Sequence, residues 1–77
     1  MSAYEVKPAA GLDPLIAQLV RARKDQNLSQ GELALKAGVS RGALCRWEIG
    51  RYRPALTSLT RWARALGLTL KAVGEDR

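Results

Sequence analysis

The chain has 77 residues, with 13 Lys and Arg against 7 Asp and Glu, one Cys and no His. A core of this size contributes little net stability. Without His or a second Cys, the chain has no internal disulfide, no zinc ligand set and no histidine base. We therefore expect no metal, no cofactor and no enzymatic activity. The net charge of +6 and the pI of about 10.3 indicate a polyanionic partner, either nucleic acid or an anionic membrane surface.

All apolar runs are short, so the sequence predicts neither a signal peptide nor a membrane-spanning segment. We therefore expect a cytoplasmic protein whose single cysteine stays a free thiol. A linker-like stretch over 7–11 separates an N-terminal arm (1–11) from a helical domain (12–67), and a tail (68–77) follows.

Asp13-Pro14 predicts the start of the first helix, because Asp is a favoured N-cap and proline is well tolerated at the first helical position. Helical periodicity places an apolar stripe along this helix, formed by Leu15, Ile16, Leu19 and Val20. Arg23 falls in the middle of that stripe, and a buried guanidinium requires a partner.

Ser29 and Glu32 form a capping-box pattern, which predicts a second helix from Gln30 to about Ala37. Gly38 ends this helix, and Ser40 caps a third helix from Arg41 to about Ile49, closed by Gly50. The inward residues of the second helix are Leu33, Ala34 and Ala37. Two short helices joined by a turn that contains glycine are typical of a helix-turn-helix.

After a basic loop, Thr57 is expected to cap a fourth helix with an apolar stripe of Leu59, Trp62, Ala63 and Leu66. The next residues alternate in steps of two and predict a half-buried strand, formed by Leu68, Thr69, Leu70, Lys71, Ala72 and Val73. This strand pairs either with residues 4–6 of the arm or with its own copy in a second chain. We favour the second arrangement, a homodimer, because a small helical core gains most from self-association.

The helix-turn-helix segment resembles the lambda-repressor/Cro-type (XRE-like) family of prokaryotic and phage DNA-binding regulators. The matching residues are Leu28-Ser29-Gln30, Glu32-Leu33-Ala34, Ala37-Gly38-Val39-Ser40-Arg41, Leu44 and Arg46-Trp47-Glu48 before Gly50, and the likeness covers roughly 15–68. It implies an all-α domain of four to five helices, to which the short C-terminal strand is added. In this family the acid at Glu48 often pairs with a buried arginine of the first helix, so we expect an Arg23–Glu48 ion pair.

The third helix is predicted to read bases, with its outward face formed by Arg41, Gly42, Cys45, Arg46 and Ile49. Arginine donates two hydrogen bonds to guanine, which makes Arg41 and Arg46 the main base contacts. Gly42 allows close approach, Ile49 faces either a thymine methyl or another surface, and Cys45 is interpreted as a small apolar filler. Ala43, Leu44 and Trp47 lie on the inward side, with Trp47 in the core rather than stacked on a base.

Phosphate contacts are predicted around this face. The resemblance assigns one to Gln30 at the start of the second helix, and the other candidates are Ser40, Arg51, Tyr52 and Arg53. The predicted function is therefore a sequence-specific regulator, a repressor that binds inverted-repeat double-stranded DNA as a homodimer. The alternative is an antitoxin that also binds a toxin protein, with the outward Leu35 in that contact. A protein-interaction module without DNA binding and a membrane-surface peptide agree less well with the outward arginines and the short capped helices.

Overall fold

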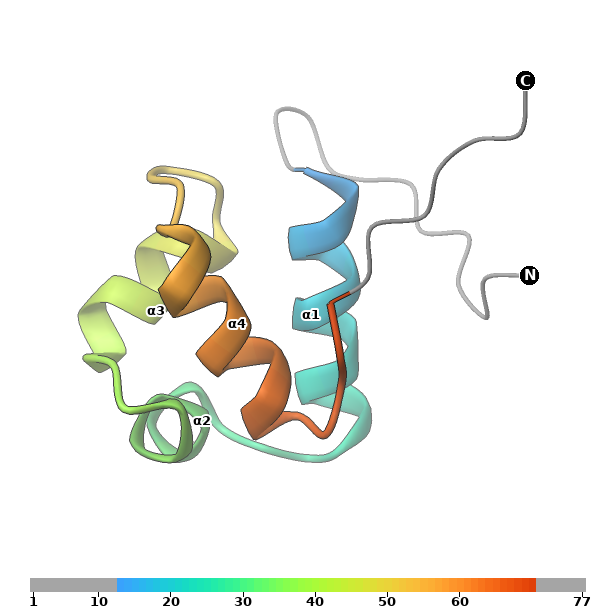
Figure 1. The fold of residues 1–77 in the computed structure, drawn as a ribbon. Helices are drawn as coiled ribbons and strands as arrows, with labels where there is room; N and C mark the ends of the chain where they lie inside the picture. Colours follow the sequence, from blue (N-terminus) through green and yellow to red (C-terminus); the bar gives the residue numbers. More distant parts are fainter. Residues whose placement is uncertain (1–12, 71–77) are drawn as a thin grey trace, which may run out of the picture.

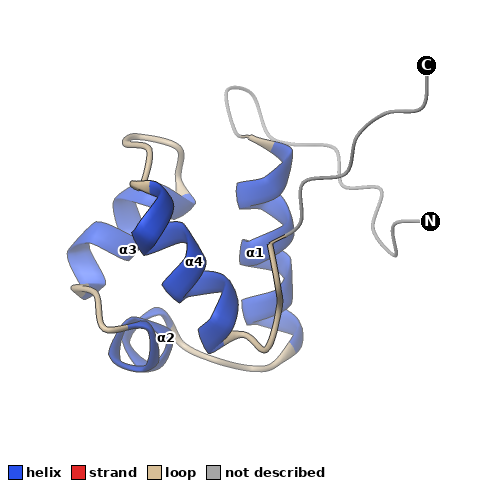
Figure 2. Cartoon of the chain, in the orientation of Figure 1, coloured by secondary structure: helices blue, strands red, loops and turns tan. Residues whose placement is uncertain are grey.

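The structure, a computed structural model, describes residues 13–70 and consists there of four helices, α1 (Pro14–Asp25), α2 (Gln30–Ala37), α3 (Arg41–Glu48) and α4 (Leu56–Ala65). α2 packs against both α3 and α4, and α1 packs against α3; in Figure 1, α2 is seen end-on below the other helices. Within residues 13–70 the only regular elements are helices, joined by loops and turns (Figure 2). None of these helices is long and apolar enough to cross a membrane.

The first three helices begin at the capping residues that the sequence predicts. The Leu15 amide donates to Asp13 Oδ1 at 2.8 Å, and the Ala43 amide donates to Ser40 Oγ at 3.0 Å. At α2 the capping box is complete, because the Glu32 amide donates to Ser29 Oγ and the Ser29 amide donates to Glu32 Oε1. Each cap satisfies an N–H group that has no partner inside its helix.

The prediction that Thr57 caps the fourth helix is wrong. α4 begins at Leu56 with Ala55 as its N-cap, no side chain caps it, and Thr57 lies inside the first turn. The Leu59 amide already donates to the Ala55 carbonyl at 2.9 Å, so the helix extends two residues further back than a threonine cap allows. Backbone hydrogen bonding in that extra stretch, together with the packing of α4 on the core, outweighs the local preference for a capping hydroxyl.

The core takes one fully buried large side chain from each helix, namely Leu19, Leu33, Leu44 and Trp62. Buried alanines on α2 and α4, Ala34 and Ala63, leave room for these helices to approach each other. Trp47 is half-buried and stacks on Trp62, with ring centroids 6.1 Å apart and an interplanar angle of 29°. The interpretation of Trp47 as a packing residue agrees with this contact.

The predicted C-terminal strand is not supported. Leu68, Thr69 and Leu70 are not in a strand; the Leu68 amide donates to the Ala63 carbonyl at 2.9 Å, in the turn that ends α4. Leu70 is half-buried against the chain's own core, while Leu68 and Thr69 are exposed. Of the two leucines in this part of the alternating pattern, only Leu70 therefore packs on the core. Lys71, Ala72 and Val73, like the arm over 1–11, lie outside the described residues.

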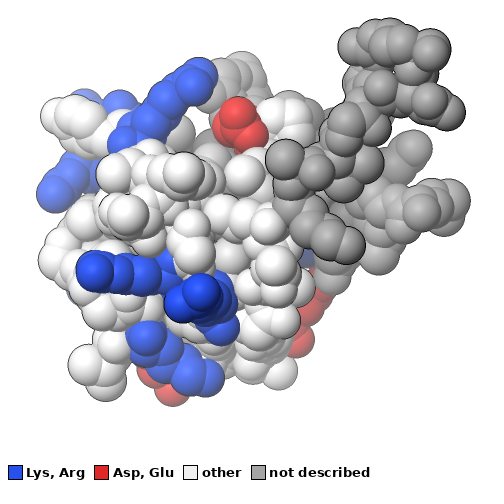
Figure 3. All heavy atoms as spheres, in the orientation of Figure 1, with Lys and Arg blue, Asp and Glu red and all other residues white. Residues whose placement is uncertain are grey.

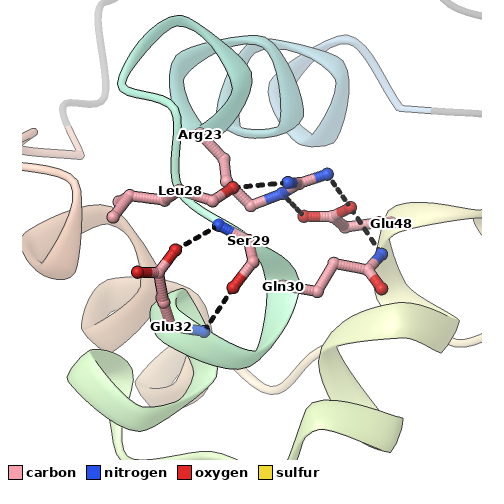
Figure 4. A network of polar contacts seen from close by, with 6 residues as sticks. All are labelled: Arg23, Leu28, Ser29, Gln30, Glu32 and Glu48. Carbon is pink, nitrogen blue, oxygen red and sulfur yellow. Dashed lines mark hydrogen bonds and ion pairs between the residues drawn. The ribbon is translucent and has the colours of Figure 1, made fainter.

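An ion pair joins the end of α1 to the end of α3 (Figure 4). Arg23 Nε donates to Glu48 Oε2 at 2.7 Å and Arg23 Nη2 donates to Glu48 Oε1 at 3.0 Å, with only 11% and 5% of the two side chains exposed. Arg23 Nη1 donates to the Leu28 carbonyl at 2.7 Å, and Gln30 Nε2 donates to Glu48 Oε1 at 2.9 Å. Each of the three nitrogens of the guanidinium that interrupts the apolar stripe thus donates a hydrogen bond, and the buried charge has its partner.

Replacing Arg23 by methionine should destabilise the protein by about 3–5 kcal/mol, because it leaves the Glu48 carboxylate buried without its cation. Urea denaturation measures the change. Arg21→Met on the same helix is the matched control, since the Arg21–Asp25 pair is largely exposed and such pairs contribute about 0–1 kcal/mol. An Arg23→Met midpoint equal to the wild-type midpoint would show that the ion pair does not support the fold.

The capping box predicts a pH dependence. The Ser29 backbone N–H, with help from the Ser29 hydroxyl, holds the pKa of Glu32 below its usual value. The resulting stability is present above the carboxyl's unfolded pKa and is lost as the pH falls through the lower, folded pKa. Wild type should therefore be more stable than Glu32→Gln at neutral pH, and the two should converge in acid. Denaturation midpoints of both proteins across the acid range test this, and a difference that stays constant with pH would contradict it.

Candidate nucleic-acid interface

The turn between α2 and α3 sets the direction of α3. Gly38 adopts a left-handed conformation with φ of 72°, and the Val39 amide donates to the Ala34 carbonyl at 3.0 Å. A residue with a side chain is strained at such a φ, which explains the glycine. On α3 itself, Leu44 and Glu48 are buried and hold the inner face of the helix against the domain.

The outer face of α3 is accessible to a partner. Arg41, Gly42, Arg46 and Ile49 are exposed, and Cys45 is half-buried. Four of the five predicted base-contact residues are therefore exposed, and Cys45 is the least accessible of them. Ile49 is 63% exposed, so it makes little contact with the chain's own core.

Arg41 rests on the first turn of α2. Its Cδ atom lies 3.8 Å from the point that a Cβ atom on Gly31 would occupy, so the aliphatic part of Arg41 passes close to the α2 backbone. Sequence reasoning missed this approach of Arg41 to Gly31, because it depends on how α2 and α3 are placed in the fold. Packing of this kind limits the directions that the guanidinium can take.

The predicted phosphate contacts occupy two places. Arg51, Tyr52 and Arg53 are exposed in the loop between α3 and α4, which leaves α3 through Gly50 with φ of 79°. Gln30 and Ser40 lie at the N-termini of α2 and α3, and both have a protein partner. Gln30 donates to Glu48, and the Ser40 hydroxyl oxygen accepts from Ala43.

The charge of this half of the molecule is strongly positive. Residues 41–64 contain six arginines and one acid, Glu48, whose carboxylate is paired with Arg23. On the face that carries α4, Figure 3 shows basic side chains spread apart rather than gathered in one patch. Arg61 and Arg64 on α4 are exposed, as expected for a solvated helix face.

Comparisons with known proteins agree with this geometry. A family model described as "Helix-turn-helix" matches residues 19–73. The "Immunity repressor protein" of Bacillus phage phi105 is 43% identical over 63 residues, which cover 79% of this chain and 44% of that protein. An "Uncharacterized HTH-type transcriptional regulator" of Methanothermobacter thermautotrophicus is 49% identical over 45 residues, covering 58% of this chain and 65% of that protein. The chain thus spans less than two thirds of each of these relatives.

A solved structure shares the fold. The crystal structure of "hypothetical transcription factor NHTF from Neisseria" superposes with a TM-score of 0.69 at 28% identity, covering 86% of this chain and 83% of that one. The family model covers most of the chain, and the residues that it matches, 19–73, include α2, the turn at Gly38 and α3. The chain therefore belongs to the XRE-type helix-turn-helix family of DNA-binding transcriptional regulators.

Proposed function

We propose that the protein is a repressor that binds an inverted-repeat operator as a homodimer and reads the major groove with α3. The observation that carries this proposal is that two arginines of α3, Arg41 and Arg46, are exposed while Leu44 and Glu48 anchor the same helix in the core. A recognition helix needs one face anchored and the opposite face free to enter the groove.

Arg41 and Arg46 are the proposed specific contacts, each able to donate two hydrogen bonds to guanine N7 and O6. Gly42 lies between them on the sequence and carries no side chain that would keep the helix from the base edges. Ile49 and Cys45 offer apolar surface on the same side, which suits a thymine methyl group.

Phosphate contacts fix the register of the complex without reading sequence. Arg51, Tyr52 and Arg53 are proposed for this role because they are exposed just beyond the end of α3. Gln30 uses one amide hydrogen on Glu48, so the second hydrogen of the same group is available to a phosphate at the positive end of α2. The Ser40 hydroxyl oxygen accepts from Ala43, which leaves its own hydrogen for a phosphate oxygen.

A repressor is favoured over an antitoxin because one relative, 43% identical, bears the name "Immunity repressor protein". The antitoxin alternative rests on Leu35, which is 84% exposed on α2. A large apolar side chain in that position is suited to a protein partner. Purification of the chain together with a toxin encoded beside it would favour the alternative.

Homodimerisation is proposed from the size of the reading surface. One α3 offers two arginines to the bases, and two base-reading side chains give weak discrimination. A second copy on the next turn of the duplex, about 34 Å away, doubles the contacts and requires a symmetric site.

The two kinds of arginine contact should respond differently to truncation. Arg41→Ala should cost about 1–3 kcal/mol on the preferred duplex and relax base preference, whereas Arg53→Ala should weaken all duplexes alike and reduce the salt slope by about one unit. Binding to a duplex selected from a random pool, and to its scrambled version, separates them across a salt series. Arg61→Ala on α4 is the matched control and should change neither. Equal losses on both duplexes for Arg41→Ala would remove it from the base contacts.

Two chains should bind each operator. Selected duplexes should contain an inverted repeat, and removing one half-site should weaken binding by about 10²-fold or more because the second chain no longer binds cooperatively beside the first. Analytical ultracentrifugation of the complex measures the stoichiometry. One chain per full-length selected duplex, with no loss on removal of half of it, would show that the protein binds as a monomer.

A further inference from the structure

Arg46 does not extend freely into solvent. Its guanidinium carbon lies 5.9 Å from the centroid of the Tyr52 ring, within the range of a cation–π contact. Ala43, Arg46, Trp47 and Tyr52 together line an open recess beside α3. The aromatic ring comes from the loop after the helix, so the fold brings it to an arginine six positions earlier in the chain.

Gly42 provides the space for this conformation. Arg46 Nη1 lies 3.5 Å and Nη2 lies 3.9 Å from the point that a Cβ atom on Gly42 would occupy. An alanine there makes ordinary contact with the guanidinium, while a longer side chain competes for the same volume. Residues four apart lie on the same helix face, and helical side chains lean toward the N-terminus, so Arg46 covers the position where residue 42 has no side chain.

We infer that Tyr52 and Gly42 are positioning residues that hold Arg46 in one conformation above the N-terminal half of α3, ready for a guanine. This inference rests on the proposed DNA binding and assigns Tyr52 a role beyond phosphate contact. A free arginine loses considerable side-chain entropy when it binds, and an arginine that is already held loses less. The ring of Tyr52, rather than its hydroxyl, performs this task.

The readout is the selectivity ratio, defined as the affinity for a duplex selected with the wild-type protein divided by the affinity for its scrambled version. A phosphate contact changes both affinities alike and leaves this ratio unchanged. Tyr52→Leu should lower the ratio about two- to fivefold, the equivalent of an exposed cation–π contact. Tyr52→Phe keeps the ring and should keep the ratio, even if both affinities fall together.

Two further comparisons link the effect to Arg46. In an Arg46→Ala background, Tyr52→Leu should lower the ratio no further, because the side chain that the ring holds is gone. Gly42→Leu should lower the ratio more than Gly42→Ala does, since only the longer side chain displaces the guanidinium. Far-ultraviolet circular dichroism and melting curves of each variant show that the fold is retained.

Several results would overturn the inference. The first is an unchanged selectivity ratio in Tyr52→Leu. The second is a selectivity ratio that falls as far in Tyr52→Phe as in Tyr52→Leu. The third is an Arg46→Ala background in which Tyr52→Leu still lowers the selectivity ratio as much as it does in the wild-type protein. The failure of the proposed function gives a different result, because no duplex would then be selected from the random pool by the wild-type protein. A selected duplex with an unaffected ratio in Tyr52→Leu would therefore refute only the positioning role.

Discussion

The Arg23–Glu48 ion pair is the interaction on which the arrangement of the helices depends. It joins α1 to the last residue of α3, and through Leu28 and Gln30 it also includes the loop before α2 and the first residue of α2. Each of these segments contributes a residue that is hydrogen-bonded to Arg23 or Glu48 (Figure 4). In a chain with so small a core, a single buried polar network can fix the direction of a short helix that has only a few apolar contacts of its own.

This ion pair holds one side of α3 in the core and leaves other residues of the helix exposed. Leu44 and Glu48 are buried and hold α3 against the domain, while Arg41 and Arg46 of the same helix remain exposed. Because the Glu48 charge is neutralised inside the domain, the positive charge of the neighbouring arginines is not offset at the surface. The same ion pair therefore positions the proposed reading helix and preserves the electrostatic attraction that a polyanion would experience.

Much of the fold was predictable from local patterns. The caps at Asp13, Ser29 and Ser40 and the left-handed Gly38 act within a few residues, so the sequence identifies them directly. The start of α4 and the strand at residues 68–70 were not predicted correctly. In both places a weak local signal competes with tertiary packing. Leu70, in particular, packs on the chain's own core, and alternation alone does not distinguish that contact from a strand partner.

By itself the sequence determined the four helices, the positive charge of the segment after Ser40 and the set of outward residues on α3, because helical periodicity and charge are local properties of the chain. Only the tertiary structure decided how those residues are held. The approach of Arg41 to Gly31, the hydrogen bond from the Gln30 amide to Glu48 and the approach of Tyr52 to Arg46 each join separate elements. Such contacts depend on helix placement, which is set by the shared core and by the ion pair that spans it.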